Sequence, residues 1–284
     1  MMSKKHAFLL FTKAPMPGLT KTRLTEARGG ILTEADAAAF YKASLLDVAE
    51  IGFRALTQLT EQAGQGNGTA PDQYDFVVCC SPASEQPMLE QLFAEAGPWP
   101  GSITFINDRG MTFDEHFDDA FQQLFDRGYH AVVSIGGDLP TMPVSHLVRA
   151  FEWLAYFDSF SDRSGFVQAP CQACGVSLVG YTKNTPMDSD GVFYNLNGIP
   201  ALDAYTRKAQ ERGVPVALLD AVADVDNVED LAHTISLMQA IAYSSIYQPE
   251  LFVPRRTLEW IEQTGIVVST PPNTLHDPRE RIDA

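Results

Sequence analysis

The sequence is poor in the residues that mark several classes of protein. Four cysteines in 284 residues are too few for a disulfide scaffold. The 20 lysines and arginines are outnumbered by 36 aspartates and glutamates, so the chain lacks the basic surface that general binding to nucleic acid or anionic lipid requires. No apolar run approaches the ~20 residues of a membrane span, and the N-terminal run is shorter than a signal-peptide core. We therefore expect a cytoplasmic protein that binds neither nucleic acid nor membranes.

Short apolar runs alternate with amphipathic segments along most of the chain. The expected strands cover residues 6–12, 75–80, 102–107, 130–135, 166–169, 176–181 and 214–219, and the expected helices cover residues 34–59, 84–96, 113–128, 143–156, 199–212 and 228–243. Continuous apolar runs of this length are typical of strands that are buried on both faces. Phenylalanines at every fourth position from 113 to 125 indicate a buried helix face. The pattern predicts an α/β protein with a mostly parallel sheet.

The expected domain covers residues 1–243, and a C-terminal extension covers residues 244–284. The extension contains several prolines and lacks clear periodicity apart from a short run at 257–263. We expect it to pack on the body or on the partner subunit of a homodimer. Residues 64–71 form the clearest loop within the domain, and we expect this loop to be mobile.

A basic loop, residues 11–24, follows the first expected strand with the sequence FTKAPMPGLTKTRL. Pro15 restricts its backbone and Gly18 allows a tight turn, so the loop loses little further entropy when it becomes ordered around a ligand. In open α/β sheets, ligands bind at the carboxyl ends of the strands. The position of the loop therefore favours a role in ligand binding.

The cations of the basic loop predict a phosphate site. Lys13, Lys21 and Arg23 lie within eleven residues of one another in an otherwise acidic chain. Arginine suits bidentate contact with phosphate, and lysine provides a compact charge. Lys21, Thr22 and Arg23 are also expected near the start of a helix, where backbone N–H groups favour an anion. The spacing matches neither the P-loop nor the dinucleotide-binding motif, and a solvated basic turn is the alternative interpretation.

A second segment at a strand end contains the sequence GGDLP. Gly136 and Gly137 would let the chain approach a ligand closely, and Asp138 would project from the strand tip. A carboxylate opposite the basic loop is well placed to hold Mg²⁺ or Mn²⁺ that bridges diphosphate oxygens. The alternative interpretation is that Asp138 caps the following helix.

A third segment, DVDN at 224–227, precedes the last expected helix. Spacing alone favours Asp226 or Asn227 as the helix N-cap. The alternative is a second metal ligand, for which Asp226 is a better candidate than Asp224.

Together these segments resemble the nucleotide-diphospho-sugar transferase superfamily, which has the GT-A glycosyltransferase fold. The resemblance is carried by KAPMPG at 13–18 with KTRL at 21–24, by IGGDLP at 135–140, and by DVDN at 224–227 with EDL at 229–231. It extends over residues 5–240 and is greatest to the DUF2064 branch of glycosyltransferase-like proteins, which is related to molybdenum-cofactor and phospholactate nucleotidyltransferases.

The resemblance implies a three-layer α/β/α fold in which the basic loop grips a nucleotide diphosphate. Asp138 would take the place of the family's metal-binding aspartate. The implied activity is transfer of a sugar from a nucleoside diphosphate-sugar to an unassigned small-molecule acceptor, assisted by Mg²⁺ or Mn²⁺. A nucleotidyltransferase that joins a nucleoside triphosphate to a phosphorylated metabolite would use the same loop and metal. A non-catalytic nucleotide-binding protein is the third interpretation.

Departures from the family pattern support the non-catalytic interpretation. The family usually has a GPxxDGGY stretch, and Ala173 falls where its aspartate would be. The later Trp-Ser-Thr of the family is not evident near residues 199–201, and His116 stands where a helix arginine is usual. On its own, His116 fits a histidine at the solvent edge of a helix better than an acid or base.

Other candidates have structural interpretations that are favoured. Cys171 and Cys174 have the spacing of half a zinc site or a redox pair, but a packed loop is the preferred interpretation. Cys79 and Cys80 end a strand and are expected to be buried thiols. Asp188 and Asp190 could replace the missing carboxylate, although a polar turn is favoured.

Overall fold

The computed structural model describes residues 3–64, 71–160 and 164–269. The strands are β1 (Lys5–Thr12), β2 (Gln73–Cys80), β3 (Ile103–Asn107), β4 (Ala131–Ile135), β5 (Phe166–Pro170), β6 (Val176–Thr182) and β7 (Val216–Leu218). The helices are α1 (Glu34–Gly64), α2 (Gln86–Ala96), α3 (Phe113–Asp126), α4 (Val144–Phe160), α5 (Ala201–Arg212), α6 (Val228–Ser244) and α7 (Arg255–Thr264). All the expected strands and helices form. Most of the expected mobile loop and the end of the C-terminal extension lie outside the described residues.

The described strands form one sheet in the order β3-β2-β1-β4-β6-β5-β7. Strand β6 runs antiparallel to β4 and β5, and the other pairings are parallel. Central strand β1 pairs with β2 along its whole length and with β4 from His6 to Leu10. The prediction of a mostly parallel sheet is confirmed.

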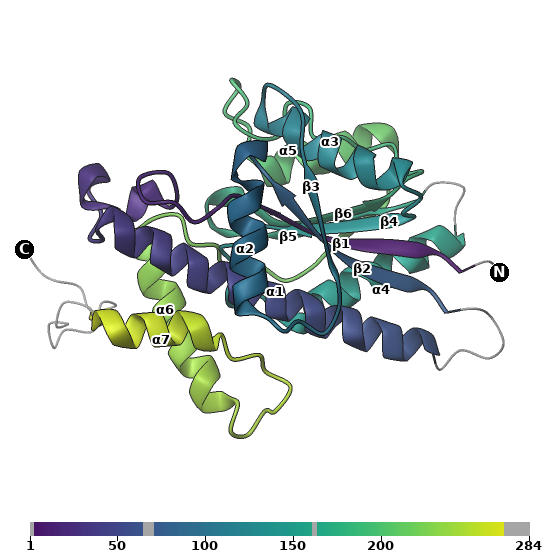
Figure 1. The fold of residues 1–284 in the computed structure, drawn as a ribbon. Helices are drawn as coiled ribbons and strands as arrows, with labels where there is room; N and C mark the ends of the chain where they lie inside the picture. The colour runs from purple at the N-terminus through teal and green to yellow at the C-terminus, as the bar shows by residue number, and fades with distance from the viewer. Residues whose placement is uncertain (1–2, 65–70, 161–163, 270–284) are drawn as a thin grey trace, which may run out of the picture.

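Helices cover both faces of the sheet, which gives three layers (Figure 1). Helices α1, α2 and α4 share a core with Phe8 and Val133 on one face. Helices α3 and α5 share a second core with Leu9 and Val132 on the other face. Neighbouring residues of a strand are therefore buried on opposite sides, which explains why β1 and β4 have continuous apolar sequences. The three-layer α/β/α architecture is confirmed.

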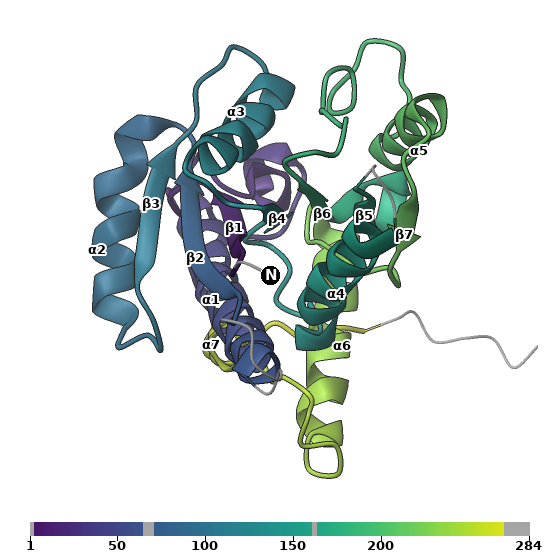
Figure 2. The same ribbon diagram turned by 90° about the vertical axis from the view of Figure 1, so that its right-hand side faces the viewer.

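Helices α6 and α7 pack on the side of α1 that faces away from the sheet (Figures 1 and 2). The ring of Phe40 in α1 lies 5.2 Å from the ring of Trp260 in α7, and Ile235 of α6 belongs to the same core. The described part of the C-terminal extension thus contacts the body of the same chain. The proposed boundary at residue 243 stays a prediction.

Asp47, in the middle of α1, anchors the start of α7. Its carboxylate is fully buried and accepts hydrogen bonds of 2.8 Å from both the backbone N–H and the hydroxyl of Thr257. The guanidinium of Arg256 donates a further bond of 3.2 Å. Burial raises the pKa of Asp47, while these donors act in the opposite direction. The docking of α7 therefore depends on a buried carboxylate whose hydrogen bonds come from the start of α7.

The carboxyl ends of β1 and β4 lie side by side and position the site, because the two strands pair directly. Gly137, just after β4, packs against α1: a Cβ atom there would lie 2.7 Å from Leu45 Cδ1 and 3.0 Å from the hydroxyl of Tyr41. The hydroxyl of Ser44 also donates to the carbonyl of Gly137 at 2.9 Å. The structure thus explains this glycine by close packing of α1, whereas the sequence suggested close approach of a ligand.

Candidate functional site

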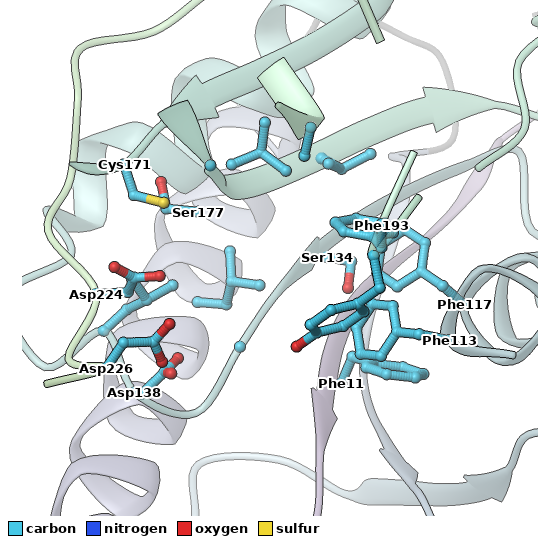
Figure 3. Close-up of a pocket in the computed structure, with 18 of the residues that line it drawn as sticks. Phe11, Phe113, Phe117, Ser134, Asp138, Cys171, Ser177, Phe193, Asp224 and Asp226 are labelled. Carbon is cyan, nitrogen blue, oxygen red and sulfur yellow. The ribbon is translucent and has the colours of Figure 1, made fainter. Parts of the chain in front are cut away.

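A cavity of about 940 Å³ opens at the carboxyl ends of β1 and β4 (Figure 3). Its lining combines the basic loop, the segment after β4, the start of β6 and the segment before α5. The charged residues of the lining are Lys13, Lys21, Arg23, Asp138, Asp224 and Asp226. Thr22, Gly136 and Gly137 also line the cavity, whereas Pro15 and Gly18 do not. Most residues that the sequence singled out are therefore brought together.

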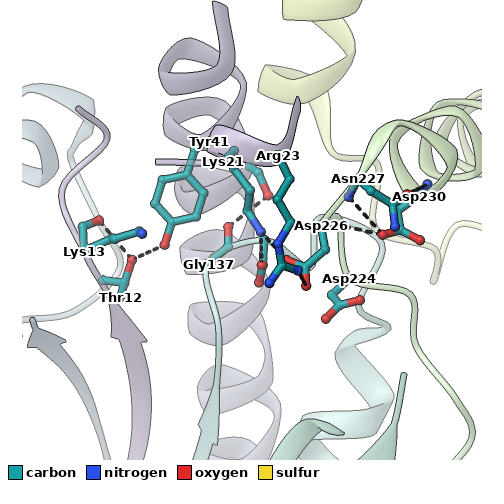
Figure 4. Close-up of polar contacts among 12 residues, drawn as sticks. Thr12, Lys13, Lys21, Arg23, Tyr41, Gly137, Asp224, Asp226, Asn227 and Asp230 are labelled. Atoms are coloured by element: carbon teal, nitrogen blue, oxygen red, sulfur yellow. Dashed lines mark hydrogen bonds and ion pairs between the residues drawn. The ribbon is translucent and has the colours of Figure 1, made fainter. Parts of the chain in front are cut away.

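The basic loop contacts the two predicted metal ligands, and Figure 4 shows Lys21 and Arg23 beside one of them, Asp226. Lys21 Nζ forms an ion pair with Asp138 and lies 3.2 Å from Asp226 Oδ1. Arg23 Nη1 lies 3.0 Å from Asp226 Oδ2. The side chain of Lys21 is only 9% exposed and that of Arg23 is 63% exposed, so the first is a buried contact and the second a surface one.

The carboxylates keep Lys21 charged in spite of its burial. Burial works against the ammonium, but the charges of Asp138 and Asp226 outweigh it and raise the pKa of Lys21. Lys13 behaves differently, because burial and then the nearby charge of Lys21 lower its pKa. The lysines of the cavity therefore differ in how readily they lose a proton.

The expectation that Lys21, Thr22 and Arg23 lie near the start of a helix holds only for a very short one. Residues 22–24 form a single 3-10 turn, and Lys21 precedes it with a left-handed φ of 49°. Helix α1 begins only at Glu34. Any anion bound here would therefore be held by the side chains of the loop. Gly18, with a φ of +76°, shapes the turn of the loop from outside the cavity lining.

Asn227 caps α6 and leaves Asp226 available to the cavity. The Asn227 side chain accepts a hydrogen bond of 3.0 Å from the backbone of Asp230, whose carboxylate accepts one of 3.1 Å from the backbone of Asn227. Asp138 is no helix cap either, since α4 begins at Val144. The structural alternatives for both predicted metal ligands are thus excluded.

Asp224 also lines the cavity, although the sequence favoured Asp226 over it. Burial, followed by the charges of Asp138 and Asp226, raises the pKa of Asp224 to about 6. The amide of Gln172 donates to the backbone carbonyl of Asp224 at 2.6 Å and to the carboxylate of Asp230 at 2.9 Å. This bridge fixes the acidic segment against the turn that follows β5.

The carboxylates of Asp138 and Asp226, the two predicted metal ligands, lie close to each other. Their carboxylates converge on one ammonium, that of Lys21, so a cation in its place would have two carboxylate ligands. Mg²⁺ typically combines one or two carboxylates with phosphate oxygens and water. Within the part of the chain that the structure describes, no three His, Cys, Asp or Glu side chains are placed to form a metal site by themselves. Water or phosphate oxygens would therefore have to complete the coordination.

The missing family carboxylate is not replaced by the residues that the sequence suggested. Ala173 lines the cavity with a left-handed φ of 55° and brings only a methyl group. Asp188 and Asp190 are outside the lining. Asp188 forms ion pairs with Lys208 and, at 2.6 Å, with Arg212, which agrees with a structural turn.

His116 and the cysteines show no arrangement for catalysis. His116 is not part of the lining, and its Nδ1 lies 3.5 Å from a carboxylate oxygen of Asp108. Cys171 lines the cavity, where burial and then Asp224 raise the pKa of its thiol, and Cys174 is exposed. All four cysteines are free thiols, and the pair that ends β2 is buried as expected.

The opposite side of the cavity is an aromatic wall, which was not predicted from the sequence. The wall consists of Phe11, Phe113, Phe117, Phe193 and Tyr194. The periodic phenylalanines indicated a buried helix face, but Phe113 is 38% exposed and faces the cavity. Ser134, a polar residue within the apolar strand β4, was the available signal for a site on this side.

One protein family is similar to part of the chain. Residues 67–195 match the DUF2064 family, described as an uncharacterized protein conserved in bacteria. None of the curated proteins matches the sequence.

Solved structures are similar to this chain to different degrees. One from Desulfovibrio desulfuricans, described as a "putative nucleotide-diphospho-sugar transferase", is 23% identical with a TM-score of 0.68 over 93% of this chain and 96% of that chain. A cytidylyltransferase from Leptospira borgpetersenii is 14% identical with a TM-score of 0.45 over 96% and 99% of the two chains, a likeness too weak to bear on the function of this chain. Residues 67–195 are therefore similar to the DUF2064 family, and the fold of the chain is that of the structure described as a "putative nucleotide-diphospho-sugar transferase".

Proposed function

We propose that this chain binds a nucleoside diphosphate-sugar in the cavity and transfers the sugar to an acceptor. The observation that carries the proposal is the meeting of Lys21 and Arg23 with Asp138 and Asp226 across the cavity rim. An acidic protein that binds a diphosphate must gather its few cations in one place. Three of the 20 lysines and arginines do so here, next to two carboxylates that suit a divalent cation.

In this proposal the basic loop neutralises the departing diphosphate. Arg23 is exposed enough to turn toward a ligand, and its guanidinium suits bidentate phosphate contact. Lys21 would exchange its carboxylate partners for phosphate oxygens. Asp138 and Asp226 would hold Mg²⁺ or Mn²⁺, which when bound stabilises the negative charge of the leaving group. Such preorganised charge lowers the barrier because it acts where charge develops.

Ala173 supports a second candidate function, nucleotide binding without turnover. This residue lines the cavity at the position where the family has an aspartate, and a methyl group can neither bind a metal nor accept a proton. The basic loop and Asp138 would still bind the diphosphate. The two candidates therefore predict the same ligand and differ only in whether it is consumed.

The test is a melting-temperature panel of UDP-, GDP-, CDP- and dTDP-sugars and of nucleoside triphosphates, each with and without Mn²⁺. We expect at least one diphosphate-sugar to raise the melting temperature, because a ligand that binds only the folded state stabilises it. Arg23→Ala should abolish that rise and change the ligand-free melting temperature little. Asp138→Asn is preferred to an alanine, since it keeps a polar partner for Lys21. Arg28→Ala is the matched control, because Arg28 is exposed and outside the cavity lining.

Product analysis separates the candidates. Release of free sugar or its transfer supports the glycosyltransferase, whereas release of pyrophosphate from a triphosphate supports the nucleotidyltransferase. A melting shift with neither product supports binding without turnover. A panel in which no nucleotide shifts the wild-type protein, or in which Arg23→Ala responds normally, overturns the proposal.

A further inference from the structure

The aromatic wall forms a continuous surface on the side of the cavity opposite the carboxylates (Figure 3). The ring of Phe113 lies 4.9 Å from that of Phe193 and 5.7 Å from that of Tyr194. The ring of Phe11 lies 5.6 Å from Phe113 and 5.3 Å from Phe117. Strand β1, helix α3 and the segment before α5 thus bring rings from three parts of the chain to one place.

The wall is held in place by specific hydrogen bonds. The carboxylate of Asp114, in the first turn of α3, accepts bonds of 3.2 Å from the backbone of Val192 and 2.9 Å from that of Phe193. Asp118, one turn later, accepts two bonds of 2.9 Å from the backbone of Ser189. The segment that carries Phe193 is therefore fastened to the helix that carries Phe113. A preformed apolar surface of this kind is typical of small-molecule sites.

Four of the five rings of the aromatic wall come from segments that contribute no charged side chain to the described lining. The charged residues of the lining come from the basic loop, from Asp138 and from the segment that contains Asp224 and Asp226. Neither α3 nor residues 192–201 contribute a charged side chain to the lining. A phosphate bound among the rings would lose its hydration without gaining a cation, which is unfavourable.

Ser134 supplies a polar group next to the rings. Its side chain lies between the carboxylates and Phe193 (Figure 3), and the residue is 2% exposed. Its hydroxyl has no hydrogen-bond partner among the described residues. A buried polar group without a partner is uncommon and costly, so a bound molecule with a hydroxyl group would complete it.

We propose that the aromatic wall and Ser134 form the acceptor compartment, and that it takes an uncharged, hydroxyl-bearing ring compound such as a neutral glycoside. One face of the ring would pack on Phe113 or on Phe193, whose rings are inclined at 69° to each other, and one hydroxyl would bond to Ser134. The identity of this ligand as acceptor rests on the proposed function. The chemistry of the compartment disfavours a phosphorylated acceptor, and so favours sugar transfer over the nucleotidyltransferase alternative.

The test uses phenyl β-D-glucopyranoside and its 6-phosphate as probes, titrated into the full chain by ligand-observed NMR and calorimetry. We expect the neutral glucoside to bind in the millimolar range and the 6-phosphate to bind at least tenfold more weakly. Phe113→Ala and Phe193→Ala should each weaken the glucoside at least fivefold, and Ser134→Ala should weaken it two- to fivefold. Phe160→Ala is the control, because Phe160 is 70% exposed and outside the cavity lining.

Titrations with and without UDP, and with UDP-glucose, show which substrate the compartment holds. If it holds the acceptor, the glucoside binds equally well when UDP is present. Competition by UDP-glucose but not by UDP means that the compartment holds the donor sugar, and the inference is overturned. It is also overturned if the 6-phosphate binds as tightly as the glucoside, or if no glucoside binding is detected at 20 mM, a concentration about twentyfold above a Kd of about 1 mM. UDP binding is measured separately in every variant, so a failure of the proposed nucleotide site is distinguished from a failure of the compartment.

Discussion

The ammonium of Lys21 forms an ion pair with Asp138, and the same ammonium lies 3.2 Å from Asp226. One lysine of the basic loop therefore stands where a divalent cation would need to lie to contact both carboxylates. Since the side chain of Lys21 is 9% exposed, the pairing is little weakened by water. If a metal ion binds as proposed, it would compete with Lys21 for these two carboxylates until a diphosphate provides Lys21 with other partners.

Lys21→Met is predicted to raise the affinity for Mn²⁺ in the absence of nucleotide. The substitution removes the competing ammonium and leaves two carboxylates that repel each other until a cation binds. We expect about a tenfold tighter Kd, which corresponds to about 1.4 kcal/mol. Calorimetry or the paramagnetic resonance signal of free Mn²⁺ measures this directly. The ligand-free variant should also melt at a lower temperature, and Mn²⁺ should restore part of the loss.

Lys13→Met is the matched control for this prediction. Lys13 lines the same cavity, but its ammonium donates to the carbonyl of Leu19 at 3.0 Å and makes no ion pair with Asp138 or Asp226. Its removal should leave Mn²⁺ affinity within about twofold of the wild type, which is a change of under 0.5 kcal/mol. Equal Mn²⁺ affinity in Lys21→Met and the wild type would show that Lys21 does not occupy the metal position.

Asp47→Ala is predicted to release α7 and to destabilise the whole chain. The carboxylate accepts hydrogen bonds from the start of α7 and from the guanidinium of Arg256, and it is fully buried. Breaking a buried charged contact of this kind costs about 3–5 kcal/mol. Urea unfolding measures the loss, and hydrogen exchange should show reduced protection in residues 255–264.

Glu50→Ala is the control for Asp47. Glu50 contacts the same guanidinium of Arg256 at 2.8 Å but is partly exposed, so its loss should cost at most about 1 kcal/mol. If Asp47→Ala unfolds at the same urea concentration as Glu50→Ala, with α7 still protected, Asp47 is not the anchor of this helix.

Local signals in the sequence were sufficient to predict the elements of the fold. Strand β1 is buried on both faces, so its sequence is apolar without interruption. The caps of α3 and α6 are also local, because Thr112 and Asn227 accept hydrogen bonds from the backbone of the third residue of each helix. These features depend on residues that are close in sequence, which is why they could be predicted without tertiary contacts.

The charged side of the site was predicted from a general rule combined with the family resemblance. Lys21 is 117 residues from Asp138 and 205 residues from Asp226, and spacing says nothing about contacts over such distances. The basic loop and the segment that contains Asp138 each follow a strand, and the two strands end at the same edge of the sheet. The rule for ligand sites in α/β proteins therefore predicted that these two segments lie together. Whether Asp226 or Asn227 caps α6 could not be decided, since both residue types are good caps.

The aromatic wall could not be predicted. Phe193 and Tyr194 lie outside any helix or strand, and the path of their segment is set by hydrogen bonds to Asp114 and Asp118 of α3. Nothing in the local sequence identifies those partners. Phe113 was expected in the core because its spacing matches that of its buried neighbours, but it lies at the first turn of α3, where the helix reaches the cavity.

The stability of the protein is predicted to fall below pH 6.5 because of His6 at the opposite edge of the sheet. His6 stacks on Tyr74 with 5.0 Å between ring centres, and burial lowers its pKa from 6.5 to about 4, although Asp72 opposes the shift. The unfolded chain therefore binds a proton at a higher pH than the folded chain does. Above pH 6.5 the burial of His6 therefore does not reduce the free energy of unfolding. This free energy then decreases as the pH falls from 6.5 to about 4. We expect a loss of about 2 kcal/mol between pH 7.5 and pH 5.

His6→Phe is the variant that isolates this effect, since a phenylalanine can keep the stacking on Tyr74 but cannot bind a proton. Urea unfolding at pH 7.5 and pH 5 gives the change in unfolding free energy for each protein, and the variant should lose about 2 kcal/mol less than the wild type. His233→Phe is the control, because His233 is exposed and should leave the difference unchanged. The ring centres of His130 and His6 lie 5.8 Å apart, and burial also lowers the pKa values of His130 and His146, so both contribute to the remaining dependence in the variant. An equal loss in His6→Phe and the wild type would mean that His6 is not the group that makes folding sensitive to acid.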